Sequence, residues 1–576
     1  MVPEERHERV ADYRFHGGIH VIRVRGSADE RARAHAHLLK KEVRDGVLSA
    51  LHSKNEWLIR RGPGLLRHGV VQDSIVWFYK KFLIPYLVHR NSADLAPIRA
   101  MAKIAGLSES RCFESLFQPD ALMLISRLSM MRFLLKDLPA GGLPACTSAV
   151  TCGNWTSDGR LLACRNLDYP VVGPWEKHTT VIFNEPSESG ALPHVAVSSA
   201  GVPVAGLTAM NAEGLTLATH AHFGREVSIR GRAIVNIADD VISRAKSLSH
   251  AVDICRKQRR IGNWSFVIAS PKDKDAVAIE MSPSRTEVRH AADGFLAHTN
   301  YFQTDLQKSE ALLSGAYCDD LVSRICAVRD LLSRDRGRID AVRMARVLGD
   351  HRDPETGDER ILGNIPSVVT TVQSVVFEPE TRRILVSTRN ESPTGIGSFV
   401  EIDTDGFWRT EAGATLEPRM FSGYQPVSRG LIQGVRSYRR AYRAWHMEND
   451  EPEYREKTLQ FLRETLELYP SDGHVWVQAG IVAFVLHRFS EAQHYFETSR
   501  EWNISRHVGF VRDLYLARSL DLAGRREEAL SLYARYERVT EPKLRNAMLK
   551  GLRKRYHSRE TSRIIVDLQF ADTFHY

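Results

Sequence analysis

Residues 146–168 of the chain read CTSAVTCGNWTSDGRLLACRNLD. Val, Thr and Leu are frequent on both sides of Ser157-Asp158-Gly159, and Asp-Gly is a strong turn dipeptide because glycine adopts positive φ at little cost. The pattern predicts a β-hairpin whose first strand begins at Cys146 and whose second strand carries Arg165 and Asp168. Folding about this turn places residues near 168 opposite residues near 148.

The hairpin brings a thiol, a guanidinium and a carboxylate to the same end of a two-stranded ribbon. A cysteine thiolate is the form that attacks amide and ester carbonyls. The positive charge of Arg165 favours the thiolate of Cys146, and Asp168 can hold a neighbouring amine. The three residues are therefore a candidate catalytic group.

A nucleophilic cysteine needs a base, and the hairpin contains no histidine. One source is a histidine from elsewhere in the chain, for which His220, His222 and His298 are the candidates. The other source is the α-amino group of Cys146 itself, which is freed if the Ala145–Cys146 bond is cut. Such a group has a pKa of roughly 7.7–8.0, which suits a base near neutral pH.

Composition and charge limit the class of protein. The 576 residues are 43% hydrophobic and 26% charged, which is typical of globular proteins with room for two to four domains. A net charge of +9 is mild for this length, and no zinc finger or aromatic-basic motif indicates a nucleic-acid partner. The charged N-terminus lacks the apolar region of a signal peptide, and no apolar run approaches the ~20 residues of a membrane helix. We expect a cytoplasmic protein without a membrane span.

Seven cysteines are scattered along the chain without Cys-x-x-Cys or another metal-ligand spacing. We therefore expect no metal and no organic cofactor. Cys152 and Cys164 are predicted to face each other across the hairpin, as packed thiols in a reducing compartment.

Residues 1–145 predict a mostly helical segment that precedes the hairpin. Residues 16–26 alternate like a strand, and Ser27 to Glu30 form a capping box that opens a long helix through about Arg60. Aromatic residues between Trp77 and Tyr86 are typical of a helix core, with an acyl-chain pocket as the alternative.

Residues 146–415 have the alternating texture of an α+β fold, in which strands are separated by turns and helices are inserted. The predicted strands are 161–168, 179–184, 194–199, 203–209, 214–220, 264–270, 276–281, 295–299, 371–377 and 383–388. The predicted helices are 231–259, 303–313, 318–334 and 339–348.

Residues 416–450 are expected to be a basic linker, and residues 451–576 are expected to be helical with an internal repeat. Small and large residues recur there at the spacing of tetratricopeptide (TPR) repeats, first at Trp476, Ala479, Gly480, Ala492 and Phe496 and again at Asp513, Leu516, Ala517, Leu520, Gly524, Ala529 and Tyr533. Such helix pairs present a surface for a protein or peptide partner. A helical cap that only packs on the catalytic region is the other interpretation.

Several segments in order resemble one enzyme family. Cys146-Thr147-Ser148 followed by Arg165-Asn166-Leu167-Asp168 resembles the N-terminal nucleophile (Ntn) hydrolases of the cholylglycine hydrolase and penicillin V acylase group. It is closer to their C45 peptidase relatives, typified by acyl-coenzyme A:6-aminopenicillanic acid acyltransferase. The segments 210–215 (MNAEGL), 295–302 (FLAHTNYF), 323–324 (SR) and 371–377 (TVQSVVF) extend the resemblance over residues 16–400.

The resemblance implies a four-layer αββα core and a role for each site residue. Cys146 is expected to be the nucleophile, exposed by autocatalytic cleavage after Ala145, with Arg165 and Asp168 ordering it. Asn300 is expected to donate to the oxyanion, and Arg324 to brace Cys146 and Asp168. Residues 1–145 then become a smaller subunit that stays bound and lines the substrate pocket.

These expectations define a self-processing cysteine acyltransferase or amidohydrolase. Its substrate is a small-molecule acyl amide or acyl thioester, acyl-coenzyme A is a possible co-substrate, and acyl transfer and hydrolysis stay open. Two alternatives also stay open. One is a cysteine hydrolase that uses a histidine base without cleavage, and the other is an inert scaffold whose TPR-like helices bind a protein partner.

Overall fold

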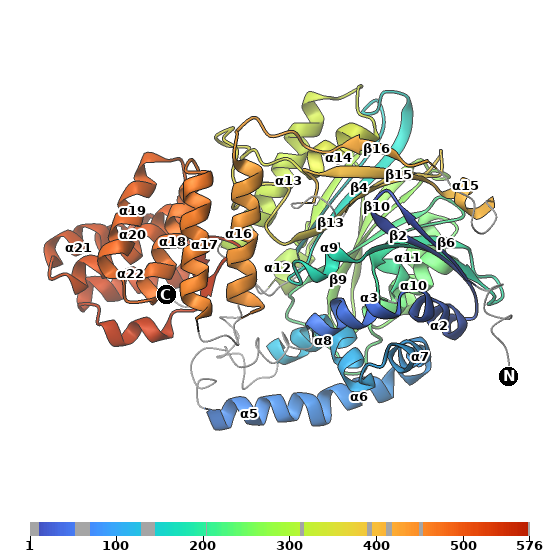
Figure 1. The fold of residues 1–576 in the computed structure, drawn as a ribbon, viewed down its shortest axis with the longest axis horizontal. Helices are drawn as coiled ribbons and strands as arrows, with labels where there is room; N and C mark the ends of the chain where they lie inside the picture. Colours follow the sequence, from blue (N-terminus) through green and yellow to red (C-terminus); the bar gives the residue numbers. More distant parts are fainter. Residues whose placement is uncertain are drawn as a thin grey trace.

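The structure is a computed structural model that describes residues 11–51, 69–127, 145–202, 204–311, 316–388, 394–409, 417–448 and 453–573. Two large sheets and many helices make up the fold (Figure 1), which confirms the expected α+β class. The C-terminal helices lie to one side of the sheets. In the same view, helices from the N-terminal third lie below the sheets.

The larger sheet has nine strands and includes the start of the chain. Neighbouring strands are antiparallel except β2 and β5, which are parallel. In spatial order the strands are β1 (Ala11–His16), β2 (Ile19–Gly26), β5 (Thr179–Pro186), β6 (His194–Ser199), β7 (Thr208–Asn211), β8 (Thr216–His222), β9 (Asn263–Ser270), β10 (Asp275–Met281) and β11 (Thr286–His290).

The second sheet has seven strands and contains the hairpin that begins near Cys146 and ends at Asp168. All its strand pairs are antiparallel. In spatial order they are β12 (Phe295–Thr299), β3 (Ala145–Gly153), β4 (Gly159–Asp168), β13 (Thr371–Glu378), β14 (Arg383–Ser387), β15 (Ser398–Asp403) and β16 (Arg419–Ser422).

The hairpin is confirmed, but its predicted register is wrong. Ala145, not a residue near 148, pairs with Asp168, and Cys146 pairs with Leu167. The strands are joined by residues 154–158, so the centre of the connection lies before the Asp-Gly dipeptide. The same register opposes Cys164 to Ala149, which means that Cys152 does not face Cys164. All seven cysteines are free thiols.

The strand predicted at 16–26 in the N-terminal segment is confirmed as β2. It is preceded by β1, which was not predicted and which pairs with β2 across a turn where Gly17 and Gly18 have positive φ. The capping box of Ser27 and Glu30 is confirmed, but the long helix breaks at Leu39, whose φ of −125° and ψ of 38° are not helical. Its later part lies outside the described residues. The helices of this segment are α2 (Ala28–Leu38), α3 (Lys40–Asp45), α5 (Gly69–Phe78), α6 (Ile84–Arg90), α7 (Ala96–Ala105) and α8 (Glu109–Arg127).

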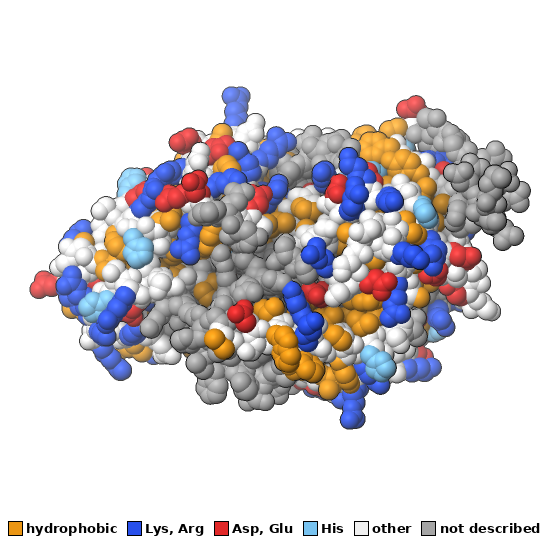
Figure 2. Space-filling model, turned by 60° about the horizontal axis from the view of Figure 1, so that its bottom comes forward, with side chains coloured by type: hydrophobic (Ala, Val, Ile, Leu, Met, Phe, Trp, Pro, Cys, Tyr) orange, Lys and Arg blue, Asp and Glu red, His pale blue; other side chains and the backbone are white. Residues whose placement is uncertain are grey.

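The aromatic stretch of this segment is only partly in the core. Tyr79 is buried, whereas Trp77, Phe78 and Phe82 are about half exposed. Figure 2 shows hydrophobic side chains gathered on the face to which these helices belong. The prediction of a helix core is therefore wrong for most of the stripe, because a 3.6-residue period does not say which face of a helix is covered.

Both sheets carry buried apolar residues on their two faces. One cluster joins residues of the two sheets, a second packs α10 and α11 on the nine-stranded sheet, and a third packs α13 and α14 on the seven-stranded sheet. The helices inserted between strands are α9 (Pro174–Lys177), α10 (Ile234–Arg244), α11 (Leu248–Lys257), α12 (Leu306–Glu310), α13 (Ala316–Arg334), α14 (Ala341–Leu348) and α15 (Thr404–Arg409).

The C-terminal helices pack against the rest of the chain. In the segment expected as a linker, α16 contributes Arg439, which donates to the Thr371 carbonyl at 3.0 Å. Asp472 accepts hydrogen bonds from the backbone of Ile361 and Leu362. These helices are α16 (Leu431–His446), α17 (Tyr454–Leu468), α18 (Gly473–Val485), α19 (Phe489–Thr498), α20 (Arg506–Leu522), α21 (Arg526–Tyr533) and α22 (Pro542–Arg553), followed by the short pair β17 (Val566–Asp567) and β18 (Asp572–Thr573).

Candidate active site

Cys146 is the second residue of β3, and its side chain is buried between the two sheets. Arg165 donates from Nη2 to the sulfur at 3.2 Å. The thiol points to the backbone carbonyl of Thr219 on β8, with 3.9 Å between the sulfur and the oxygen. The sulfur therefore lies between β3 of one sheet and β8 of the other, next to the positive charge of Arg165.

Arg165 is held by a short turn, η6 (Ala205–Leu207), and by β8. Its guanidinium donates to the Leu207 carbonyl, to the Thr208 hydroxyl and, at 2.6 Å, to the Thr219 carbonyl. Because the side chain is buried, these neutral acceptors compensate part of the cost of removing its charge from water. The guanidinium is thereby fixed against the sulfur of Cys146.

Asp168, the last residue of β4, pairs with Arg324 of α13. Arg324 Nη1 lies 2.8 Å from Asp168 Oδ2, and Arg324 Nε lies 2.9 Å from Asp320 Oδ2 one helical turn earlier. Arg324 also donates to the Thr147 hydroxyl at 2.8 Å, and Thr371 donates to Asp168 Oδ1 at 2.7 Å. Arg324 therefore links Thr147, the residue after Cys146 on β3, to the carboxylate of Asp168.

Asn300 follows β12 and contacts the backbone N–H of Cys146. Its Oδ1 accepts the N–H of Cys146, and its Nδ2 donates to the Ala221 carbonyl at 2.7 Å. The amine that cleavage would create at Cys146 thus already has an acceptor, and that acceptor is Asn300 rather than Asp168.

The three candidate histidines form a separate buried network. His220 Nε2 lies 2.9 Å from the Ser148 hydroxyl, while His222 and His298 share the Ser265 hydroxyl at 2.7 and 2.6 Å. Burial lowers the pKa of all three rings, that of His222 to about 3. In the described part of the chain, none of them hydrogen-bonds to the sulfur of Cys146.

Burial also governs the ionisation of the site. It raises the pKa of the Cys146 thiol, although the Arg165 charge acts in the opposite direction. It raises the pKa of Asp168 to about 6, against the lowering effects of Arg324 and the Thr371 hydroxyl. The thiol of the uncut chain is therefore protonated at neutral pH and requires a base.

A narrow, mostly apolar cavity of about 90 Å³ reaches Cys146 and Arg165. The N-terminal segment and the core both contribute walls, so residues 1–145 are part of the site's structure. Its apolar lining residues are Val47, Leu48, Leu51, Leu116, Pro119, Leu167, Trp175, Val202, Val204, Leu207, Ala221, Ile234, Val235 and Trp264.

Five residues singled out in the sequence thus come together: Cys146, Arg165, Asp168, Asn300 and Arg324. The partners that hold them were not predicted, and these include the Thr219 carbonyl and the Thr371 hydroxyl. Asp320 was also missed, although its i, i+4 spacing from Arg324 on a predicted helix was a usable signal.

The described residues contain no group of three His, Cys, Asp or Glu side chains that could hold a metal ion. None of their helices is long and apolar enough to cross a membrane.

Comparison with protein families supports the same class of enzyme. The sequence model of the acyl-coenzyme A:6-aminopenicillanic acid acyl-transferase family matches residues 155–393. The match spans less than half of the chain and includes Arg165, Asp168, Asn300 and Arg324, but it begins after Cys146. It supports an Ntn-type acyltransferase or hydrolase. No curated protein matches the chain significantly.

Proposed function

We propose that the protein is an autoproteolytic cysteine acyltransferase or amidohydrolase with an αββα Ntn core. The observation that carries the proposal is the pair of contacts at Cys146, whose sulfur meets Arg165 and whose backbone N–H meets Asn300. The first contact suits a thiolate, and the second suits a free α-amino group at the same residue.

Cleavage is the first proposed step. Cys146 Sγ attacks the carbonyl carbon of Ala145, a C–S bond forms, and the Ala145–Cys146 C–N bond breaks as the nitrogen takes the thiol proton. Water then hydrolyses the thioester, which leaves a carboxylate on Ala145 and restores the thiol. The freed amine stays in reach of Asn300 Oδ1, which holds its N–H in the uncut chain.

Acyl transfer follows on the same sulfur. The α-amine of Cys146 takes the thiol proton, the thiolate attacks the substrate's acyl carbonyl, and the leaving amine or thiol departs with that proton. The acyl group then passes from Cys146 to an amine or to water. A role for Asn300 as oxyanion donor, as the family resemblance implies, requires its Nδ2 to exchange the Ala221 carbonyl for the substrate oxygen.

A direct test is mass spectrometry of the purified protein after incubation with an octanoyl thioester. We expect an octanoyl group on the peptide that begins at Cys146. Acylation of another cysteine, or a peptide that still contains Ala145 joined to an acylated Cys146, would contradict the proposal.

The cavity predicts selectivity for the length of an apolar acyl chain. Val235 on α10 is only partly buried at its wall, so Val235→Phe extends into the space without overpacking a tight core. We expect kcat/KM to fall about 10- to 100-fold for octanoyl substrates and to change little for acetyl substrates. Val322→Phe, at an exposed site on α13, is the matched control. Equal losses for both chain lengths would exclude this cavity as the acyl site.

The pKa of Asp168 predicts the acid limit of activity. The ionised carboxylate is the form that pairs with Arg324, so activity is expected to be lost as the pH falls through about 6. Thr371→Val removes a hydrogen bond to that ionised form, which should move the acid limb of kcat/KM upward by roughly one pH unit. Thr394→Val is the control, because this buried hydroxyl donates only to a backbone carbonyl. An unmoved limb would assign it to another group.

A further inference from the structure

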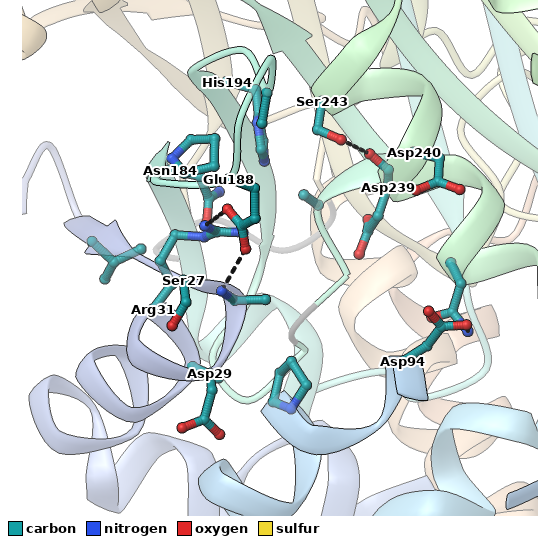
Figure 3. A pocket seen from close by; sticks show the side chains of 18 of the residues that line it. Ser27, Asp29, Arg31, Asp94, Asn184, Glu188, His194, Asp239, Asp240 and Ser243 are labelled. Carbon is teal, nitrogen blue, oxygen red and sulfur yellow. Dashed lines mark hydrogen bonds and ion pairs between the residues drawn. The ribbon is translucent and has the colours of Figure 1, made fainter. Parts of the chain in front are cut away.

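A second, larger pocket lies between the N-terminal helices and the nine-stranded sheet (Figure 3). Its volume is about 460 Å³, which is within the range of small-molecule sites. It shares no lining residue with the cavity at Cys146. Nothing in the proposed reaction uses it.

The lining of this pocket is acidic. Five carboxylates and three guanidinium groups contribute to it. Arg31 pairs with Glu188 at 3.0 Å, and Arg232 pairs with Asp94 at 3.0 Å and also with Asp240. Arg244 lies 3.8 Å from Asp240. Each guanidinium charge is therefore balanced by a carboxylate that also lines the pocket.

Asp29 pairs with Arg33, which lies outside the lining, at 2.6 Å. Asp239 is then the lining carboxylate without an ion pair among the described residues. It projects from α10 into the pocket, and it accepts the backbone N–H of Gly206 at 2.8 Å. The described chain contains no ion pair to it. Burial raises the pKa of Asp239 to about 7, so a cation placed beside it would favour its ionised form.

His194 supplies an independent sign of a ligand. It is 4% exposed, and Figure 3 shows its ring entering the pocket from another wall. Its Nδ1 lies 2.9 Å from the Leu192 carbonyl, which can only accept, so Nδ1 carries the proton. Burial lowers the pKa of His194 to about 4, which keeps the ring neutral. Nε2 is thus a hydrogen-bond acceptor without a protein partner among the described residues, and it is aimed into the pocket.

We propose that this pocket binds a small organic cation with N–H donors, such as a primary ammonium, between the Asp239 carboxylate and His194 Nε2. The described side chains here form no cluster of three metal ligands, which favours an extended organic cation over a bare metal ion. The proposal does not rest on the proposed function.

The pocket is adjacent to the catalytic group through η6. Ala205 lines the polar pocket, while Leu207 lines the cavity at Cys146 and accepts a hydrogen bond from Arg165. Gly206 between them donates to Asp239. A ligand on Asp239 would therefore bind beside the turn whose Leu207 carbonyl accepts a hydrogen bond from Arg165.

The test is isothermal titration calorimetry of the full-length Cys146→Ala protein with 1,4-diaminobutane. Using this variant separates binding from cleavage and turnover. We expect saturable binding of the diamine and no binding of 1,4-butanediol, which has the same length without charge. Equal binding of the diol or of MgCl₂, or no binding of the diamine, would overturn the proposal.

Two variants assign the binding to the pocket. Asp239→Asn should weaken binding at least about tenfold, because it removes the buried counter-charge. His194→Asn should also weaken it, since asparagine keeps a donor for the Leu192 carbonyl but loses Nε2. Asp253→Asn, an exposed carboxylate on the neighbouring α11, should change nothing. Unchanged affinity in both pocket variants, at retained melting temperature, would refute the site.

Discussion

The Cys146→Ala protein is expected to remain a single uncut chain and to lose acyl transfer by at least about 10³-fold. In the proposed reaction, the Cys146 sulfur attacks the Ala145 carbonyl and later carries the acyl group, and alanine removes this sulfur. Denaturing electrophoresis and intact-mass measurement of purified wild type should show fragments 1–145 and 146–576, while the variant should show only the full-length chain.

Cys164→Ala is the matched control for this prediction. Cys164 is also buried, and it lies on the strand paired with β3, opposite Ala149. Its loss should leave cleavage intact. A wild-type protein that is active while uncut would refute self-processing and would require another base. Cleavage and activity that persist in Cys146→Ala would show that Cys146 is not the nucleophile.

Arg324→Met is expected to destabilise the protein by about 3–5 kcal/mol, the cost of breaking a buried ion pair from one side. Arg324 is fully buried between Asp168 and Asp320, and both carboxylates are buried as well. Without the guanidinium, both must be protonated or lie unpaired in an apolar surrounding. Urea unfolding at pH 7 measures the effect.

The control for this prediction is Arg338→Met. Arg338 makes an i, i+3 pair with Asp335, but the two side chains are 65% and 41% exposed, so the free energy of unfolding should change little. Adding Asp168→Asn to Arg324→Met should recover part of the loss, since one unpaired charge is removed. A loss in Arg324→Met as small as that in the control would show that the buried network is not important for stability.

Local sequence patterns were sufficient for much of the fold. Asp-Gly and β-rich flanks predicted the hairpin at Cys146, and the α+β class and most strands between 161 and 388 were also predicted. The pairing of residues across the hairpin was predicted wrongly: Asp168 was placed opposite residues near 148, whereas it pairs with Ala145. Turn chemistry marks a connection but does not fix which residues pair across it.

Sequence by itself determined the identity and the local setting of the groups in the proposed site: a thiol at the start of a strand, and a guanidinium and a carboxylate on the returning strand. Tertiary structure alone decided that the N–H of Cys146 meets Asn300, that Thr371 donates to Asp168, and that His220, His222 and His298 bond to serines rather than to the sulfur. The physical reason is range. Turn and strand preferences act within a few residues, whereas these contacts join segments brought together by the order of strands in two sheets and by burial of apolar surface between them.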